Sequence, residues 1–566
     1  NPGFFPMHDD TQVARVFEMH KSLSDGMFPV RWVADLGYGY GYPIFNFYAP
    51  LAYYIGALFI FLGFNALVAT KIMIGLGIIL AGVFMYIFAR EFWGKTGGVI
   101  SAALYVYAPY HALNTYVRGA VTELWAYALI PLTFFSIYKL FFDLRVYASL
   151  EQKSKIKNQK SKIKQDIWFW VCLTAISYAA IIISHNLTAM MVTPFIFLFA
   201  TFLYIKLRTA DTIHKPYFIF LGLLIGIFLS AFYWLPVLFE MKFTDVLSVV
   251  GGGSDYKDHF ACHTQLWSSP WGFAGSGPGC VDGFSLMIGK LHIVLGIISL
   301  IVFPFLFKKD KNKFYICLIF LILLLLSIFL TLKESRFIWD ALPHMAFFQF
   351  PWRFLVTVSF FISFFGGAIF WLLVNIGLPK YILGPANWIT CTVVIAAIII
   401  INADVFTPQK FISVKTADYT SKDTLNWKIS KISDEYMPKG FFKPLRSIDV
   451  PKRKFELTDK NLKISSIDEK TQQIRATVIA PEKTTIYVNV AYFPGWHVFV
   501  DNKQVWFKYS GQGLLIDIPK GRHTLDIKFT QTPIEMTGNS ISIAGVIVLL
   551  AGIISHRNKI YDQKSS

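Results

Sequence analysis

The sequence predicts a polytopic α-helical membrane protein with an external β-sandwich-like domain inserted before its last transmembrane helix. The 566-residue chain is 55% hydrophobic and only 16% charged, and its mean hydropathy is +0.50. A soluble chain of this length could not cover so much apolar surface. Runs of about 18–20 apolar residues recur, each long enough to cross a hydrocarbon core of roughly 30 Å. Short alternating segments near the C-terminal end predict the β domain.

The predicted membrane spans divide the chain into four parts. We expect a first external loop with interfacial helices (1–70), a transmembrane helical domain (71–402), an external β-rich domain (403–535), and a last transmembrane helix with a cytoplasmic tail (536–566). Hydropathy alone does not decide whether the apolar run 48–64 spans, because about 17 residues is the lower limit. The chain begins with NPGFFPMHDD, which is already polar, so we expect that a preceding spanning helix is missing from it.

The distribution of basic residues predicts how the chain is oriented in the membrane. The formal net charge is +18, which in a soluble protein would suggest nucleic acid. Here the basic residues lie in short loops between apolar runs, so we expect a membrane and no nucleic acid as the partner. Cytoplasmic loops collect Lys and Arg, which places the Lys-rich segments 151–165 and 308–313 inside. Counting through the spans then puts 111–123, 240–290, 333–353 and 403–535 outside.

The part before the last apolar run differs in kind. Residues alternate between apolar and polar in QQIRATVIA, TTIYVNVAY, WHVFVD, LLIDI and HTLDIKF, with turn-like breaks at Asp501-Asn502 and Lys520-Gly521. Short strands at this spacing predict a β-sandwich.

Two of the five cysteines share one long polar loop. Cys262 and Cys280 can form a disulfide if the loop faces an oxidising compartment, or stay as two free thiols. Cys172, Cys317 and Cys391 lie inside apolar runs and are expected to be inert packing residues.

An acidic pair precedes a predicted amphipathic helix, TQVARVFEMHKSL. Asp9 and Asp10, next to His8, can bind a divalent metal or take a proton from an acceptor hydroxyl. The alternative is that they cap the helix, because carboxylates satisfy the free N–H groups and the dipole at a helix start.

Four further polar residues lie at predicted outer ends of spans. Arg118 and Glu123 flank a helix start, and an Arg fork suits phosphate; a local ion pair is the alternative. Arg353 in FQFPWRFL needs a partner at membrane depth, such as a lipid phosphate, unless it snorkels to the interface. His185 can donate to phosphate or relay a proton, or it can be a structural histidine bonded to the backbone.

Several signals are absent from the sequence. It holds no Walker loop, no GxGxxG after a strand, no HExxH, no zinc-type cysteine spacing and no GxSxG in context. ATPase, dehydrogenase and zinc protease functions therefore have no support.

Longer segments carry a family resemblance. GYGYPIFNFYAPLAYYIGAL, YVYAPYHALNTYVRGAVTE, SHNLTAM, YWLPVLFE and FQFPWRFL resemble the bacterial and archaeal membrane proteins called "6-pyruvoyl-tetrahydropterin synthase related". The end of the chain, with AYFPGWHVFVDNKQV and IPKGRHTLDIKF, is similar to YfhO-like membrane proteins. Both groups resemble members of the GT-C superfamily, polytopic glycosyltransferases that use polyprenyl-phosphate sugars.

The resemblance implies a GT-C-type glycosyltransferase in the plasma membrane of a prokaryote. Asp9 and Asp10 match the acidic motif of the first external loop, and Glu123 matches an acidic residue of the second. The pattern also implies that 48–64 is interfacial. A sugar would pass from a polyprenyl-phosphate donor to an external glycan or protein by inverting displacement, with Asp9 as the base and Arg118, Arg353 and His185 at the donor phosphate.

Three features stay open at this point. Asp9, Asp10 and Glu123 are the candidate ligands if a divalent cation such as Mg²⁺ or Mn²⁺ takes part. The acceptor is not indicated, because a WWD-type triplet is absent. A non-catalytic relative that transports lipid-linked glycan or acts as an envelope scaffold is the alternative function.

Overall fold

The structure is a computed structural model that describes residues 3–151, 157–208, 217–375, 380–456 and 462–564. Within this part, seven helical segments are long and apolar enough to cross a membrane, or nine if each of two bent pairs is one span. The elements that form the seven are α4 (Ala66–Val106), α6 (Val121–Glu151), α7 (Lys157–Ser184), α8 (Asn186–Arg208), α14 (Lys311–Thr331), η7–α16–α17 (Pro351–Phe354, Leu355–Gly366, Ala368–Asn375) and α21 (Pro533–Lys564).

Helix α4 reverses direction at Gly94. This residue has a φ of 74° and a ψ of −175° inside an otherwise helical segment of 41 residues. A Cβ on Gly98 would lie 2.9 Å from the Cβ of Arg90, and a Cβ on Gly82 would lie 3.0 Å from Val106. Only an antiparallel pair brings residues so far apart in the sequence together, since a straight helix rises about 1.5 Å per residue. The reversal falls in a short basic segment that contains Arg90 and Lys95.

Two apolar runs form bent pairs, and two are short. Helices α9 (Phe218–Leu229) and α10 (Ala231–Glu240), followed by η2 (Met241–Phe243), bend by 63°, whereas α12 (Lys290–Ser299) and α13 (Val302–Lys309) bend by 41°. Helix α18 (Lys380–Asn402) holds a shorter apolar part at Trp388–Asn402. Helix α3 (Leu51–Phe61) has 11 residues, about 16 Å at 1.5 Å per residue, which is too short for a bilayer core of roughly 30 Å.

The β-rich domain consists of two antiparallel sheets. One sheet has the order β1-β4-β8-β7 and the other the order β2-β3-β9-β5-β6. Inward residues alternate with outward ones, as in β3 and β5, because successive side chains of a strand point to opposite faces. The strands are β1 (Phe455–Glu456), β2 (Lys463–Lys470), β3 (Gln473–Ala480), β4 (Thr484–Val488), β5 (Trp496–Val500), β6 (Lys503–Val505), β7 (Phe507–Tyr509), β8 (Leu514–Ile518) and β9 (Gly521–Phe529).

The strands begin later than the expected domain boundary at 403. Short helical elements occupy the chain between α18 and β1, and they pack beside the N-terminal segment (residues 3–65), as the isolated bridge between Phe4 and Ile412 shows. They are η8 (Asp404–Phe406), α19 (Ala417–Thr420), η9 (Thr424–Ile429), α20 (Ser430–Ile432) and η10 (Ser447–Asp449). Alternation is visible only in the strands themselves, so the sequence did not reveal this connecting region.

The loop between η2 and α12 is closed by a disulfide. Cys262 and Cys280 are bonded, with Cα atoms 5.6 Å apart, which confirms the pairing over the two free thiols. Closure of a loop of 18 residues stabilises the folded state by about 3 kcal/mol in the chain-entropy model. Cys172, Cys317 and Cys391 are buried and free, as expected. The loop also carries η3 (Val246–Val249), η4 (Tyr256–Asp258) and α11 (His263–Trp267).

A group of buried charges, here called the clamp, joins the last helix to the rest of the chain. Arg31 donates to Asn46 at 3.0 Å, and Asn46 donates to Glu240 on α10 at 2.7 Å. Glu240 also accepts from Thr532, whose backbone N–H donates to Glu535 of α21 at 3.1 Å. Arg31 interacts electrostatically with both carboxylates. The clamp therefore fixes the start of α21, directly after the β-rich domain.

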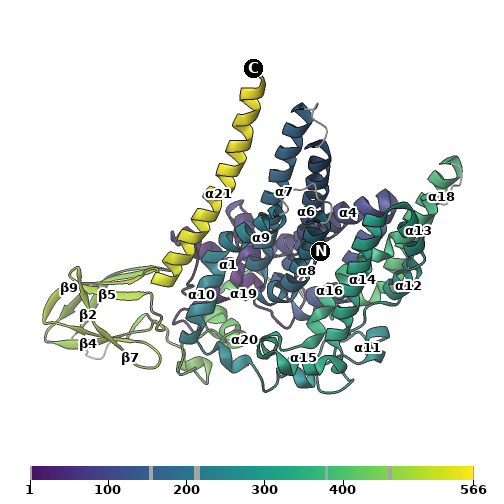
Figure 1. Cartoon of the computed structure of the whole chain (residues 1–566). Coiled ribbons are helices and arrows are strands. Elements are labelled where there is room, and N and C mark those ends of the chain that lie inside the picture. Colours follow the sequence, from purple (N-terminus) through teal and green to yellow (C-terminus); the bar gives the residue numbers. More distant parts are fainter. Residues whose placement is uncertain (1–2, 152–156, 209–216, 376–379, 457–461, 565–566) are drawn as a thin grey trace.

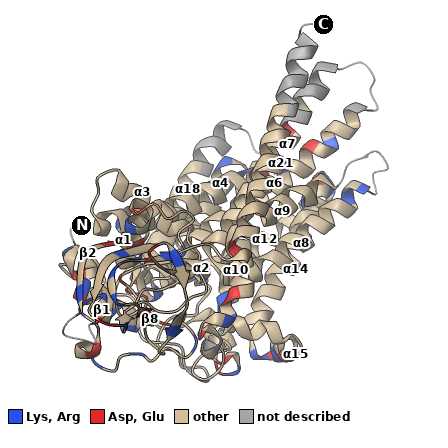
Figure 2. Cartoon of the chain, turned by 90° about the vertical axis from the view of Figure 1, so that its left-hand side faces the viewer, with Lys and Arg blue, Asp and Glu red and all other residues tan. Residues whose placement is uncertain are grey.

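The elements separate toward two ends of the helical bundle. Figure 1 shows the β-rich domain with α11, α15 (Arg336–Ala341) and α20 toward one end, and the C-terminal part of α21 with the α6–α7 tip toward the other. Figure 2 shows that the long helices carry few charged residues between their ends. Residues 152–156 of the Lys-rich segment lie outside the described residues.

Candidate functional site

The backbone of residues 8 and 9 is hydrogen-bonded to the loop before α6, which fixes the position of the acidic pair. The backbone N–H groups of His8 and Asp9 donate to the carbonyls of Val117 and Arg118 at 2.9 and 3.0 Å. Helix α1 (Gln12–Ser24) follows, with Thr11 at its N-cap and no side-chain cap. Neither carboxylate caps this helix, so helix capping does not explain the acidic pair.

The loop before α6 places an arginine beside a buried carboxylate. A π-helix (η1, Leu113–Arg118) ends at Gly119, which has a φ of 66°. A Cβ on Gly119 would lie 2.3 Å from the sulfur of Met7, so only glycine permits this close approach. Arg118 Nη1 then lies 2.8 Å from Glu123 Oε2. The local ion pair considered from the sequence is present.

Glu123 is fully buried, and both of its oxygens are engaged. Oε1 accepts from the Tyr110 hydroxyl at 2.5 Å, and Oε2 accepts from Arg118. Arg118 also donates to Asn114 at 2.5 Å, and its guanidinium lies 5.0 Å from the ring centre of Trp352. Glu123 is thus a counter-charge that holds Arg118 in place.

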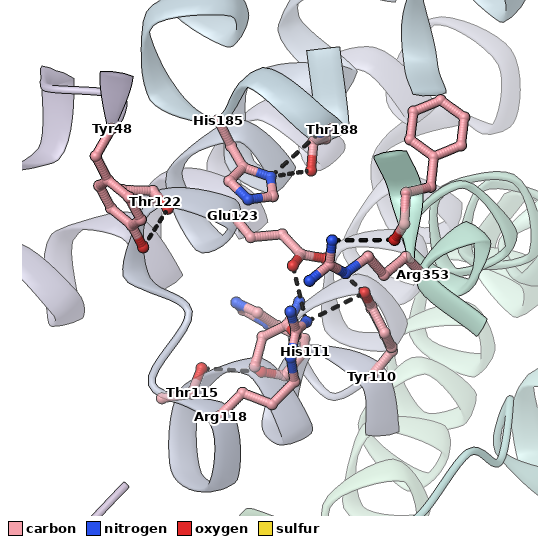
Figure 3. Close-up of polar contacts among 12 residues, drawn as sticks. Tyr48, Tyr110, His111, Thr115, Arg118, Thr122, Glu123, His185, Thr188 and Arg353 are labelled. Atoms are coloured by element: carbon pink, nitrogen blue, oxygen red, sulfur yellow. Dashed lines mark hydrogen bonds and ion pairs between the residues drawn. The ribbon is translucent and has the colours of Figure 1, made fainter. Parts of the chain in front are cut away.

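Arg353 brings a second guanidinium to the same place, and this one is buried (Figure 3). It is 9% exposed and donates from Nη1 to the carbonyl of Phe348 at 3.1 Å. It interacts electrostatically with Arg118 and Glu123. Because the side chain is buried, it does not snorkel to the surface. Among the described residues, its Nε and the Nδ2 of Asn114 are buried without a hydrogen-bond partner.

His185 lies between α7 and α8 and faces Glu123 (Figure 3). Its Nδ1 is 3.2 Å from the backbone N–H of Thr188, which donates to it. This bond to the backbone is the structural role considered from the sequence, and it assigns the proton of the neutral ring to Nε2. Burial lowers the pKa of His185 to about 4, so the ring is neutral near pH 7.

The two aspartates face different surroundings. The exposed carboxylate of Asp9 interacts electrostatically with Arg118 and Arg353, and it makes no side-chain hydrogen bond within the described residues. Asp10 instead accepts from the Tyr419 hydroxyl at 3.4 Å. Burial raises the pKa of Asp10 to about 6, although the bond from Tyr419 opposes this rise. The structure therefore groups Asp9, Arg118, Glu123, Arg353 and His185, which we call the arginine cluster, and leaves Asp10 to one side.

Sequence reasoning missed a third arginine near Asp9. Arg15 is 3% exposed and donates to Ser433 at 2.8 Å, and its guanidinium lies 4.2 Å from the ring centre of Tyr48. It interacts electrostatically with Asp9 and Glu435. The amphipathic pattern of α1 predicted a solvent-facing polar side, so it gave no sign that Arg15 is buried.

The candidate metal ligands do not form one set. Within the part of the chain that the structure describes, no group of three or more His, Cys, Asp or Glu side chains is arranged to hold a metal ion. Glu123 is engaged by Tyr110 and Arg118, and Asp10 by Tyr419. Asp9, Asp10 and Glu123 do not fit a shared cation, and we derive no step through one.

These features define the class of protein: a polytopic α-helical membrane protein with a β-rich domain before its last helix and a buried arginine cluster at the ends of its helices. The comparison with protein families agrees. Residues 45–155 match the model of the 6-pyruvoyl-tetrahydropterin synthase related domain, described as a membrane protein. This match confirms the resemblance for the segment that contains Arg118 and Glu123.

More distant similarities reach further along the chain. An uncharacterized protein of Lactococcus lactis subsp. cremoris is 23% identical over 235 residues, which is 40% of this chain and 35% of that protein. The crystal structure of the apo Archaeoglobus fulgidus oligosaccharyltransferase has a TM-score of 0.43 at 13% identity. The oligosaccharyltransferase AglB of the same organism, in complex with an inhibitory peptide and a dolichol-phosphate, has a TM-score of 0.32 at 11% identity. Each structural match covers 71% of this chain and 52% of the archaeal chain.

Proposed function

We propose that this chain is a membrane glycosyltransferase of the GT-C type that transfers a sugar from a polyprenyl-phosphate donor to an external acceptor. It would lie in the plasma membrane of a prokaryote, with the arginine cluster and the β-rich domain facing outside. The observation that carries the proposal is the charge of the arginine cluster. Arg353, which is buried, and Arg118, which is largely buried, share one buried carboxylate, whereas the other anion of the cluster, Asp9, is exposed.

A buried surplus of positive charge is costly unless an anion neutralises it. The unpartnered N–H groups of Arg353 and Asn114 also call for an acceptor, since a buried donor without a partner costs about 1–3 kcal/mol. A lipid phosphate meets both needs, because its oxygens accept several hydrogen bonds and carry negative charge. Its polyprenyl tail would stay in the bilayer beside the spans.

The proposed reaction is a displacement at the anomeric carbon. Asp9 accepts the proton of the acceptor hydroxyl while the oxygen of that hydroxyl forms a bond to the anomeric carbon. The bond from that carbon to the donor phosphate breaks, and polyprenyl phosphate leaves with the electron pair. Arg353 and Arg118 offset the charge that forms on the leaving phosphate, and the Nε2–H of neutral His185 can donate to it. Glu123 acts through Arg118, as a positioning residue.

Replacing Asp9 by Asn tests the proposal. Membranes that contain the chain are incubated with radiolabelled polyprenyl-phosphate sugars, and the label is followed into lipid-free products. Asp9→Asn is expected to abolish transfer, because the exchange removes basicity and keeps shape. Asp10→Asn is expected to retain part of the activity, because Asp10 faces Tyr419.

The matched control is Asp258→Asn, which changes an exposed aspartate at the end of η4. It should transfer sugar at the rate of the unchanged chain. Full activity in Asp9→Asn, with loss in Asp10→Asn, would move the base to Asp10. Absence of transfer from every donor in the unchanged chain would favour the glycan-transport or scaffold alternative.

A further inference from the structure

Two aromatic rings lie against the guanidiniums of the arginine cluster. The guanidinium of Arg118 is 5.0 Å from the ring centre of Trp352, and that of Arg353 is 5.0 Å from the ring centre of Phe350. The rings of Phe350 and Trp352 are stacked on each other, with centres 5.0 Å apart. Because a cation is attracted to the face of an aromatic ring, the position of these two rings helps to fix where both guanidiniums lie.

One of these rings is held by residues 259–285, here called the disulfide loop. The indole N–H of Trp352 donates to the Ser276 hydroxyl at 3.2 Å. The ring of Phe284 packs edge-on against Trp352, with ring centres 5.3 Å apart. The disulfide loop therefore holds the ring on which Arg118 lies, although it makes no part of the proposed reaction itself.

The disulfide loop also reaches the segment that carries the proposed base. His8 Nε2 lies 2.9 Å from the carbonyl oxygen of Phe273, and it donates there because a carbonyl can only accept. The backbone N–H groups of His8 and Asp9 donate to the carbonyls of Val117 and Arg118 on the other side. The segment that carries Asp9 is thus held between the loop before α6 and the disulfide loop.

A single carboxylate organises the disulfide loop. Asp282 Oδ1 accepts from the Ser276 hydroxyl at 2.7 Å and from the backbone N–H of Gly277 at 3.1 Å. Its Oδ2 accepts from Gln265 Nε2 at 2.6 Å. Gln265 and Asp282 follow closely after the two bonded cysteines, so the carboxylate and the disulfide join the same two stretches of chain. Because the Ser276 hydroxyl donates to Asp282, its oxygen lone pairs face Trp352.

We propose that Ser276 and Asp282 are positioning residues of the arginine cluster, and that the cluster is competent for transfer only while the Cys262–Cys280 disulfide is intact. The inference rests on the proposed function, because it concerns the rate of the same transfer. The base and the cations must keep a fixed arrangement, since a displacement of about 1 Å can lower a rate about 10²-fold. The disulfide loop contacts both the segment of the base and the ring beside a cation.

The first test measures amide hydrogen exchange by mass spectrometry on the purified full chain in detergent micelles, with and without dithiothreitol. The two thiols of the reagent pass two electrons and two protons to the disulfide, which gives two cysteine thiols and the cyclic disulfide of the reagent. Cys280 is exposed and the other three cysteines are free, so this is the bond that the reagent breaks.

Reduction should speed the exchange of the His8 and Asp9 amides by about tenfold, while the strands β3 and β9 keep their exchange rates. The Cys262→Ser/Cys280→Ser variant should exchange as the reduced chain does and should not respond to the reagent. Unchanged exchange of the His8 and Asp9 amides on reduction would overturn the inference.

The second test compares two exchanges at one position. Ser276→Ala removes the hydroxyl, whereas Ser276→Thr keeps it and adds a methyl group. Ser276→Ala should lower the transfer rate per folded protein about tenfold or more, because Trp352 loses its acceptor; Ser276→Thr should transfer at nearly the rate of the unchanged chain. A role in packing alone would give the reverse order, with Ala tolerated and Thr impaired, and that order would overturn the proposal.

The third test removes the charge of the carboxylate. Asp282→Asn keeps the shape of the side chain but weakens the bonds from three donors, so transfer per folded protein should fall about tenfold. Asp255→Asn is the matched control, because Asp255 is also a half-buried carboxylate of this external region that accepts from a backbone N–H, yet it caps η4. It should transfer normally. Equal losses in the two variants would overturn the positioning role of Asp282.

Exchange and transfer together separate this inference from the proposed function. Faster exchange on reduction with an unchanged transfer rate would overturn the positioning role and leave the proposed function standing. Absence of transfer from every donor in the oxidised, unchanged chain would overturn the proposed function and the transfer part of this inference. The exchange rates would still decide whether the disulfide loop holds the segment of Asp9.

Discussion

The clamp and the arginine cluster bury charge in opposite proportions. In the clamp, Arg31 is shared by Glu240 and Glu535, and hydrogen bonds within the chain link these residues into one group. In the arginine cluster, Arg118 and Arg353 share Glu123. The contacts of the clamp stabilise the fold by holding helix α21 to the N-terminal segment. The buried part of the arginine cluster holds one cation more than carboxylates, and under the proposed function an anion from outside the chain would neutralise it.

The comparison predicts the largest stability loss in the clamp. Arg31→Met removes the cation that two buried carboxylates share, so the free energy of unfolding should fall by about 3–5 kcal/mol. Denaturant unfolding in micelles measures this loss, and limited proteolysis should show release of the β-rich domain. Arg446→Met is the control, because its ion pair with Asp449 is exposed to solvent and should contribute little to stability. A loss of the same small size in Arg31→Met would show that the clamp is not structural.

The same exchange in the arginine cluster should act on activity. Arg353→Met removes the surplus cation and leaves the Arg118–Glu123 pair intact, so the free energy of unfolding should change by no more than about 1 kcal/mol. Sugar transfer should fall by about 10²–10³-fold, as when one charge-stabilising group is lost from an active site. Unfolding is measured in micelles and transfer in membranes that contain the same variant. Unfolding as severe as in Arg31→Met, with transfer rates preserved in the folded fraction, would reverse the assignment of the two regions.

A third buried acidic group, Glu18, makes the stability of the fold depend on pH. Burial and the neighbouring Asp35 raise the pKa of Glu18 to about 8, against an ordinary value of 4.5, while Lys21 opposes the rise. The folded state therefore keeps this proton longer than the unfolded state. Its contribution to stability is full below pH 4.5 and is lost as the pH rises to about 8, at no more than about 1.4 kcal/mol per pH unit.

Glu18→Gln cannot titrate, so its melting temperature should fall less between pH 6 and 9 than that of the unchanged chain. Glu482→Gln, at an exposed position between β3 and β4, is the control and should keep the original pH dependence. If Glu18→Gln shows the same pH dependence as the control, another group causes the loss.

Features set by local pattern could be predicted from the sequence, whereas features set by distant partners could not. Hydropathy located the spans, and alternation located strands such as β3 and β5. The spacing of Cys262 and Cys280 left their pairing open until the structure placed them together. The amphipathic helix predicted at TQVARVFEMHKSL is also present as α1, and its Val13 and Val16 are fully buried.

The same helix shows where local pattern fails. Arg15 and Glu18 are buried because Ser433 and Asp35 cover them, and nothing within α1 indicates those partners. For the candidate site, residue types and positions gave Asp9, Arg118 and Arg353, and the structure brings their charges together. No local pattern shows that Glu123 accepts hydrogen bonds from Tyr110 and Arg118. The same holds for the hydrogen bond that Asp10 accepts from Tyr419.

The reversal of α4 at Gly94 bears on how the chain enters the bilayer during synthesis. Its two arms meet so closely that a methyl group on Gly98 would lie 2.9 Å from the Cβ of Arg90. If one arm entered the bilayer alone and paired with the other later, the surface around Gly98 would first face lipid. The translocation machinery should release residues 66–106 as one hairpin, with Arg90 and Lys95 left together at its tip. Added positive charge at that tip should therefore reinforce the orientation of both arms at once.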